Sequence, residues 1–220
     1  MDSSVLRAAV RDAFKITGQS TPAWTDPRPD GQAPSEAEFE MCEDPGKFRI
    51  VAARAEAWVV ALTQTGLAEA ETLEGSDELW KEVPETGPAI RVVRLRPKRD
   101  SAVPMLFGFS WLHDEPEARV VLGAGEPAAV VGILPLCECD ACDVGSNLLL
   151  DDFDDAVLNV VTGQLVHVTA EKFVAHTSLQ GPVVIGELSG MTTKSFDEMF
   201  AAARAGKSPY PVIYGSRWWV

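Results

Sequence analysis

Four short apolar runs follow one another in the middle of this 220-residue chain, and they constrain its fold more than any other feature. Gly and Pro separate the runs, a pattern typical of successive strands in an antiparallel sheet. Three later runs predict a second antiparallel meander, and the C-terminal segment predicts a last strand. In chain order the segments are AIRVVRLRP (89–97), VPMLFGFSWL (103–112), ARVVLG (118–123), AAVVGILP (128–135), QLVHVTA (164–170), FVAHTSL (173–179), PVVIGEL (182–188) and YPVIYGSRWWV (210–220).

Four other segments carry apolar residues at helical spacing, namely 3–15, 45–67, 147–161 and 195–207. Because strand runs and helices do not alternate regularly, the sequence predicts an α+β fold with a mostly antiparallel sheet and about four helices. No internal repeat or linker divides the chain, so we expect a single compact domain spanning 1–220. Residues 17–36 are rich in Pro, Gly, Asp and Ser, which predicts a long loop.

Side-chain oxygens at the predicted helix starts indicate the capping residues. Asp44 is expected to cap the helix at 45–67, Ser146 or Asn147 the helix at 147–161, and Ser195 the last helix. The third helix carries four aspartates that are expected to point mostly toward solvent: Asp151, Asp152, Asp154 and Asp155.

The chain is strongly acidic, with a formal net charge of −14 from 33 acidic and 19 basic residues. Such a field repels nucleic acid and anionic membranes, so neither is expected as a partner, whereas a basic protein partner is compatible. Arg91, Arg94 and Arg96 form a short basic strip, which on an acidic protein more often makes ion pairs. Trp218 and Trp219 would lie on opposite faces of the last strand, and an exposed one would indicate a partner surface.

The N-terminal stretch interrupts its apolar residues with charges, unlike a signal peptide. No run approaches the roughly 18 apolar residues of a membrane-spanning helix. We therefore expect a cytoplasmic protein, and thiols in that compartment are usually reduced.

Three of the four cysteines lie within six positions, in the segment Cys137-Glu138-Cys139-Asp140-Ala141-Cys142-Asp143. Thiolates at this spacing can converge on one metal ion, and the pair 139–142 has the two-residue gap of a zinc knuckle. A structural zinc site usually has four ligands. The fourth would be Asp140, Asp143, the distant Cys42 or a histidine, and we take Cys137, Cys139, Cys142 and Asp143 as the candidate set.

The charges around the cysteines favour a cation over a reactive thiol. Seven acidic and no basic residues lie between 137 and 155, a field that attracts a divalent ion and raises thiol pKa values. Three hypotheses remain open: a structural metal site, unliganded thiols that oxidise on isolation, and a redox or metal-dependent catalytic site.

The run LPLCECDACDVGSNLLLDDFDDAVLNVVTGQLVHVTA, the helix KFRIVAARAEAWVVAL and the tail ARAGKSPYPVIYGSRWW resemble a family of uncharacterised actinobacterial proteins. That family is identified by a central C-x-C-D-A-C-D-x-G-S signature before an acidic helix. The resemblance covers most of the chain, and it implies no activity because the family is a domain of unknown function.

The histidines offer weaker candidates. His113 precedes Asp114 and Glu115 and is expected in a solvated turn. His167 and His176 lie on adjacent predicted strands and are expected to be cross-strand neighbours that could bind metal or titrate near neutral pH. A surface or partly buried, hydrogen-bonded histidine is the more common outcome.

These observations favour a non-enzymatic binding or interaction protein whose cysteine-rich loop holds a structural zinc ion. One alternative is a metal- or thiol-dependent enzyme that uses the cluster with His113 or His167. Another is an acidic inhibitor of a basic toxin or nuclease.

Overall fold

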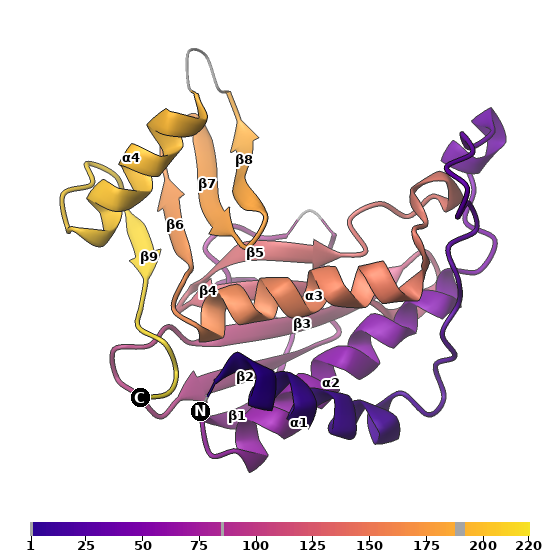
Figure 1. Ribbon diagram of the computed structural model, residues 1–220, viewed down its shortest axis with the longest axis horizontal. Helices are drawn as coiled ribbons and strands as arrows, with labels where there is room; N and C mark the ends of the chain where they lie inside the picture. Colours follow the sequence, from indigo (N-terminus) through magenta and orange to yellow (C-terminus); the bar gives the residue numbers. More distant parts are fainter. Residues whose placement is uncertain (1, 85, 188–191) are drawn as a thin grey trace.

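The computed structural model describes residues 2–84, 86–187 and 192–220. Its described part contains four α-helices and two antiparallel sheets in one compact domain (Figure 1). The α+β prediction is therefore confirmed. Among the described residues, no helix is both long enough and apolar enough to cross a membrane.

The larger sheet is a five-stranded meander in the order β1-β2-β3-β4-β5, with every neighbouring pair antiparallel. Four of its strands contain the predicted runs, and β1 precedes them. The strands are β1 (Ala68–Glu74), β2 (Arg91–Pro97), β3 (Met105–Leu112), β4 (Glu115–Gly125) and β5 (Ala128–Leu134).

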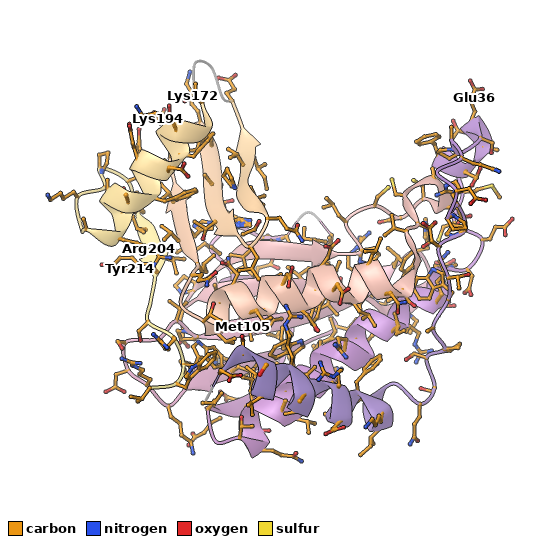
Figure 2. The ribbon with its side chains drawn as sticks, viewed as in Figure 1. Glu36, Met105, Lys172, Lys194, Arg204 and Tyr214 are labelled. Atoms are coloured by element: carbon orange, nitrogen blue, oxygen red, sulfur yellow. The ribbon has the colours of Figure 1, made fainter. Side chains whose placement is uncertain are left out.

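Helices cover one face of this sheet and form the main core with it. They are α1 (Ser3–Thr17), α2 (Arg49–Gln64) and α3 (Gly145–Val161). Trp58 of α2 and Phe153 of α3 are fully buried with Phe107 and Met105 of β3, the latter labelled in Figure 2. On the opposite face the ring of Trp80 lies so close to Gly108 that an added Cβ there would be 2.8 Å from it.

The helix starts differ in part from the prediction. Asp44 accepts a hydrogen bond from the Lys47 N–H as expected, but it caps a 3₁₀ turn, Pro45–Phe48, that leads into α2. Helix α3 begins before Ser146, and neither Ser146 nor Asn147 caps it. Thr192, rather than Ser195, caps the last helix, α4 (Thr193–Arg204).

One aspartate of α3 was expected to be exposed and is buried instead. Asp154 is 2% exposed and accepts hydrogen bonds from Arg54 Nε (2.9 Å), Arg54 Nη2 (2.6 Å) and Trp58 Nε1 (2.7 Å). Asp151 and Asp152 do face solvent. The cation and indole supplied by α2 satisfy a buried carboxylate, which helical periodicity alone does not predict.

The smaller sheet has the order β8-β7-β6-β9 and stands over the C-terminal end of α3 (Figure 1). Its strands are β6 (Val166–Thr169), β7 (Phe173–Ser178), β8 (Gly181–Gly186) and β9 (Val212–Tyr214). Helix α4 covers one face, where Phe196 and Phe200 pack against Val166, Val168 and Ala175. The expected strand at 182–188 ends at Gly186, and Leu188 lies outside the described residues.

The C-terminal tryptophans do not lie on the last strand as predicted, because β9 ends at Tyr214. Trp218 is 2% exposed and Trp219 is 8% exposed, and both join the main core. The Trp218 N–H donates to the Val161 carbonyl at 2.9 Å, so this segment packs against the end of α3 and extends beyond β9. No partner surface is indicated there.

Residues 18–35 follow an irregular path, as expected from their composition. Together with the short turn Glu36–Phe39 they form an arm at the side of the molecule, with Glu36 at its outer end (Figure 2). The loop between β5 and α3 lies beside this arm (Figure 1), and Arg28 of the arm donates hydrogen bonds to carbonyls of that loop.

Candidate metal centre

The loop between β5 and α3 brings the three clustered cysteines together. Cys137, Cys139 and Cys142 place their Sγ atoms within 4.8 Å of one another, and the Sγ atoms of Cys137 and Cys139 are 3.1 Å apart. Cys137 and Cys142 are exposed, and Cys139 is partly buried. A single 3₁₀ turn, Asp140–Cys142, folds the chain back so that the third thiol meets the first two.

Arg28, from the irregular arm, holds this turn from outside. Its guanidinium donates to the carbonyls of Asp140 (3.0 Å), Ala141 (2.7 Å) and Asp143 (3.1 Å). The same group pairs with Glu38 at 2.6 Å, which balances its charge. These charge-assisted hydrogen bonds fix the backbone of the turn without any contribution from the thiols.

The segment before α2 provides a second attachment. The Asp140 N–H donates to the Met41 carbonyl at 2.8 Å, and the Glu43 N–H donates back to the Asp140 carboxylate at 2.9 Å. Lys47 Nζ lies 3.6 Å from the other Asp140 oxygen. Asp140 therefore joins two segments that are about a hundred positions apart.

Asp143 was expected as the fourth ligand, but its carboxylate accepts hydrogen bonds from three other groups. It accepts from Trp24 Nε1 (2.9 Å), Lys47 Nζ (2.6 Å) and the Gly145 N–H (2.8 Å), and it is 8% exposed. Burial alone would raise its pKa, but the hydrogen bonds from Lys47, Trp24 and Gly145 outweigh burial and lower the pKa below its usual value. Within the described residues, Asp143 lies outside the group of three close thiols.

The start of α3 is fastened to the arm at Trp24. Ser146 Oγ donates to the Trp24 carbonyl at 3.0 Å and accepts from the Trp24 N–H at 3.1 Å. Ser146 is not the cap because α3 already begins at Gly145. Gly145 has φ +81°, and an added Cβ there would lie 2.5 Å from the Asp26 backbone nitrogen. Glycine is needed at this position because the arm crosses the chain so closely.

The hydrogen bonds within the cluster shift the pKa values of Cys137 and Cys142 in opposite directions. Hydrogen bonds from the Cys139 N–H and thiol lower the pKa of Cys137. Hydrogen bonding with Cys137 and then with Cys139 raises the pKa of Cys142 to about 12. A nearby cation would favour deprotonation of Cys142, whose pKa the neighbouring thiols raise.

The other candidates for a fourth ligand are not part of the group of ligand atoms within 4.8 Å of one another that the three thiols form in the described residues. Cys42 is partly buried against Phe48, and burial raises its pKa. His113 has φ +51° in the β3–β4 turn, as expected for a turn residue, and its Nε2 lies 3.3 Å from Glu138 of the cysteine loop. His167 follows the C-terminal end of α3, about 25 Å of helix from the loop.

The two remaining histidines are cross-strand neighbours, as predicted. His167 of β6 pairs with His176 of β7, and their ring centroids are 6.2 Å apart. They are 3% and 8% exposed, and neither Nδ1 has a hydrogen-bond partner among the described residues, unlike the hydrogen-bonded histidines that were expected. Burial lowers both pKa values to about 4, with contributions from Lys81 at His167 and from His167 at His176.

All three arginines of the basic strip form ion pairs with glutamates, as expected. Arg94 and Arg96 both pair with Glu71 and Glu126, and Arg91 pairs with two glutamates, Glu56 and Glu117.

Sequence reasoning did not identify the residues that hold the loop in place. Arg28 and Trp24 lie in a segment without helical or strand periodicity, and Lys47 lies at the start of a helix. No local pattern connects them to the cysteines, because their contacts span about a hundred residues.

Comparison with known proteins places most of the chain in a single family. A family model described as a family of unknown function (DUF6226) matches residues 10–219. No curated protein and no solved structure matches the chain. Because the match extends over nearly the whole sequence, the chain belongs to the DUF6226 family.

Proposed function

We propose that this protein binds a zinc ion through Cys137, Cys139 and Cys142 and acts as a metal-binding protein rather than an enzyme. The observation that carries the proposal is the convergence of three Sγ atoms within 4.8 Å of one another. Zinc–sulfur bonds of about 2.3 Å in a tetrahedral shell place two sulfurs about 3.8 Å apart. Small side-chain rotations therefore suffice to form three bonds.

The fourth ligand would come from outside this group. Asp143 could serve only by giving up its bonds to Lys47 and Trp24, and those bonds hold the loop. A water molecule or a side chain of a partner protein would complete the coordination at the two exposed thiols, Cys137 and Cys142. An open position of this kind suits reversible metal binding.

Metal binding would not be required for folding. Arg28, Asp140 and Asp143 already hold the loop through hydrogen bonds to the arm and to the segment before α2. Removing the metal would therefore lower the free energy of unfolding only by the contribution of metal binding, with a corresponding decrease in melting temperature. The fold would remain intact. This distinguishes the site from a zinc finger, which unfolds without its metal.

A zinc titration against a chromogenic chelator, under reducing and oxygen-free conditions, tests the proposal. Wild-type protein is expected to withdraw one zinc ion per chain, and Cys139→Ser is expected to lose this ability. Cys42→Ser is the matched control, because it removes a thiol that lies outside the cluster. Failure of the wild type to compete, or equal competition by Cys139→Ser, would refute the proposal.

A further inference from the structure

The thiols of the cysteine loop form a ligand set of three without a fourth member. In the described residues, no histidine or carboxylate joins the group of ligand atoms that Cys137, Cys139 and Cys142 form within 4.8 Å of one another. The Asp143 carboxylate is occupied by its hydrogen bond from Lys47. A tetrahedral zinc ion needs one more ligand from outside this set. For an ion that binds three ligands, the same set is complete.

The sulfur positions suit an ion of pyramidal geometry. Trivalent arsenic bonds three sulfurs at the base of a pyramid, and its lone pair occupies the fourth direction. The sulfurs of such a pyramid nearly touch one another, and the Sγ atoms of Cys137 and Cys139 are already 3.1 Å apart. The Sγ atom of Cys142 lies within 4.8 Å of both, and this side chain is exposed, so a rotation can bring it closer. Thiolates are also the soft ligands that select soft ions.

Charge balance distinguishes arsenic from zinc at this site. Three thiolates around a zinc dication carry a net negative charge, whereas three thiolates around trivalent arsenic are neutral. Three cations that contact the loop, Arg28, Lys47 and Arg119, already pair with Glu38, Asp143 and Glu138. These pairs leave none of the three cations to balance an extra negative charge on the thiols, so a neutral complex is favoured.

The cluster is accessible to a small solute. Cys137 and Cys142 are exposed, and Arg28 holds the turn through backbone carbonyls rather than through the thiols. We propose that Cys137, Cys139 and Cys142 bind trivalent arsenic, taken up as arsenous acid. Each thiol proton joins an arsenic hydroxyl, so that three As–S bonds replace three As–O bonds and three water molecules leave. Arsenic remains trivalent throughout, and no oxidant or reductant is required.

This inference rests on the same convergence of thiols as the proposed zinc site, but it requires no fourth ligand. The probe is sodium arsenite, added without oxygen to protein that has been reduced with a phosphine and treated with chelator. Intact-mass spectrometry gives the stoichiometry, because the adduct adds the mass of one arsenic atom less that of three hydrogens. Alkylation and peptide mapping then identify the protected cysteines, with Cys42 as the internal control outside the cluster.

The wild type is expected to bind one arsenic atom per chain, with Cys137, Cys139 and Cys142 protected and Cys42 alkylated equally with and without arsenite. Each single Cys→Ser variant of the cluster leaves two thiols and should weaken binding at least about tenfold, whereas Cys42→Ser should change it less than about twofold. Absence of an adduct at micromolar arsenite would overturn the inference. So would an adduct that has lost only two hydrogens, because it would be bound through two thiols.

Zinc titration of the same samples separates this inference from the proposed zinc site. Arsenite binding through three thiols without zinc binding would refute the zinc proposal and leave this inference intact. Zinc binding with no arsenite adduct, or with a two-thiol adduct, would do the reverse.

Discussion

Helix α3 separates two groups of residues that resemble potential metal ligands in the sequence, the three thiols before it and the histidine pair after it. The thiols of Cys137 and Cys142 are exposed on a loop held by other residues. His167 and His176 are almost completely buried between strands, and their Nδ1 atoms have no partner in the described residues. Because the histidines are buried, their protonation is coupled to unfolding. The exposed thiols, in contrast, are accessible to solutes.

The largest effect expected from this contrast is a pH dependence of stability that comes from the histidines. Their pKa values are about 4 in the folded protein, against 6.5 for the unperturbed side chain. The unfolded chain therefore binds more protons between these values, and stability is complete above pH 6.5 and decreases as the pH falls toward 4. Each histidine should cost on the order of 2 kcal/mol between pH 7 and pH 5.

Chemical denaturation of the wild type and of His167→Leu/His176→Leu at several pH values measures this effect. The variant is expected to lose most of the dependence in this window. Identical pH slopes in the two proteins would contradict the assignment, because they would mean that the histidines titrate equally in the folded and unfolded chains.

A smaller effect is expected from the attachment of the cysteine loop. Asp143→Ala leaves the Lys47 ammonium and the Trp24 indole without their carboxylate, although Lys47 keeps its 3.6 Å contact with Asp140. We expect a loss of about 1–3 kcal/mol in the free energy of unfolding. Denaturant titration measures the loss, and Asp151→Ala, an exposed aspartate of α3, should change stability by less than about 0.5 kcal/mol.

The same variant also tests whether a fixed loop matters for binding. If the thiols depend on the bonds of Asp143, zinc affinity should fall together with stability. Undiminished zinc affinity in a destabilised Asp143→Ala protein would show that the cluster assembles without this attachment.

The smallest effect is expected from the thiols themselves. Cys139→Ser should change the free energy of unfolding of the metal-free protein by less than about 0.5 kcal/mol. In the described structure, the Cys139 side chain makes its hydrogen bonds only within the cysteine cluster. Thermal unfolding in the presence of a chelator measures it. A loss of several kcal/mol would instead assign the cysteines a structural role and remove the contrast with the histidines.

Much of the fold was predictable because local patterns specify it. The runs at 89–135 became β2 to β5, and the helical spacing at 3–15 and 147–161 became α1 and α3. The cross-strand pairing of His167 and His176 followed from two strands joined by a short turn. Errors occurred where a distant partner decided the outcome, as when Arg54 and Trp58 of α2 supplied the hydrogen bonds that bury Asp154 of α3.

The sequence by itself determined most of the secondary structure, the antiparallel pairing of successive strands and the presence of three clustered thiols, since these depend on residues close together in the chain. Only the tertiary structure decided which polar groups are satisfied. Buried Asp154 accepts hydrogen bonds from Arg54, and Asp143 accepts them from Lys47 and Trp24. Asn159 Oδ1 has no donor in the described structure. The reason is physical: a buried charge or amide needs a partner supplied by another element, and local periodicity does not specify which element that is.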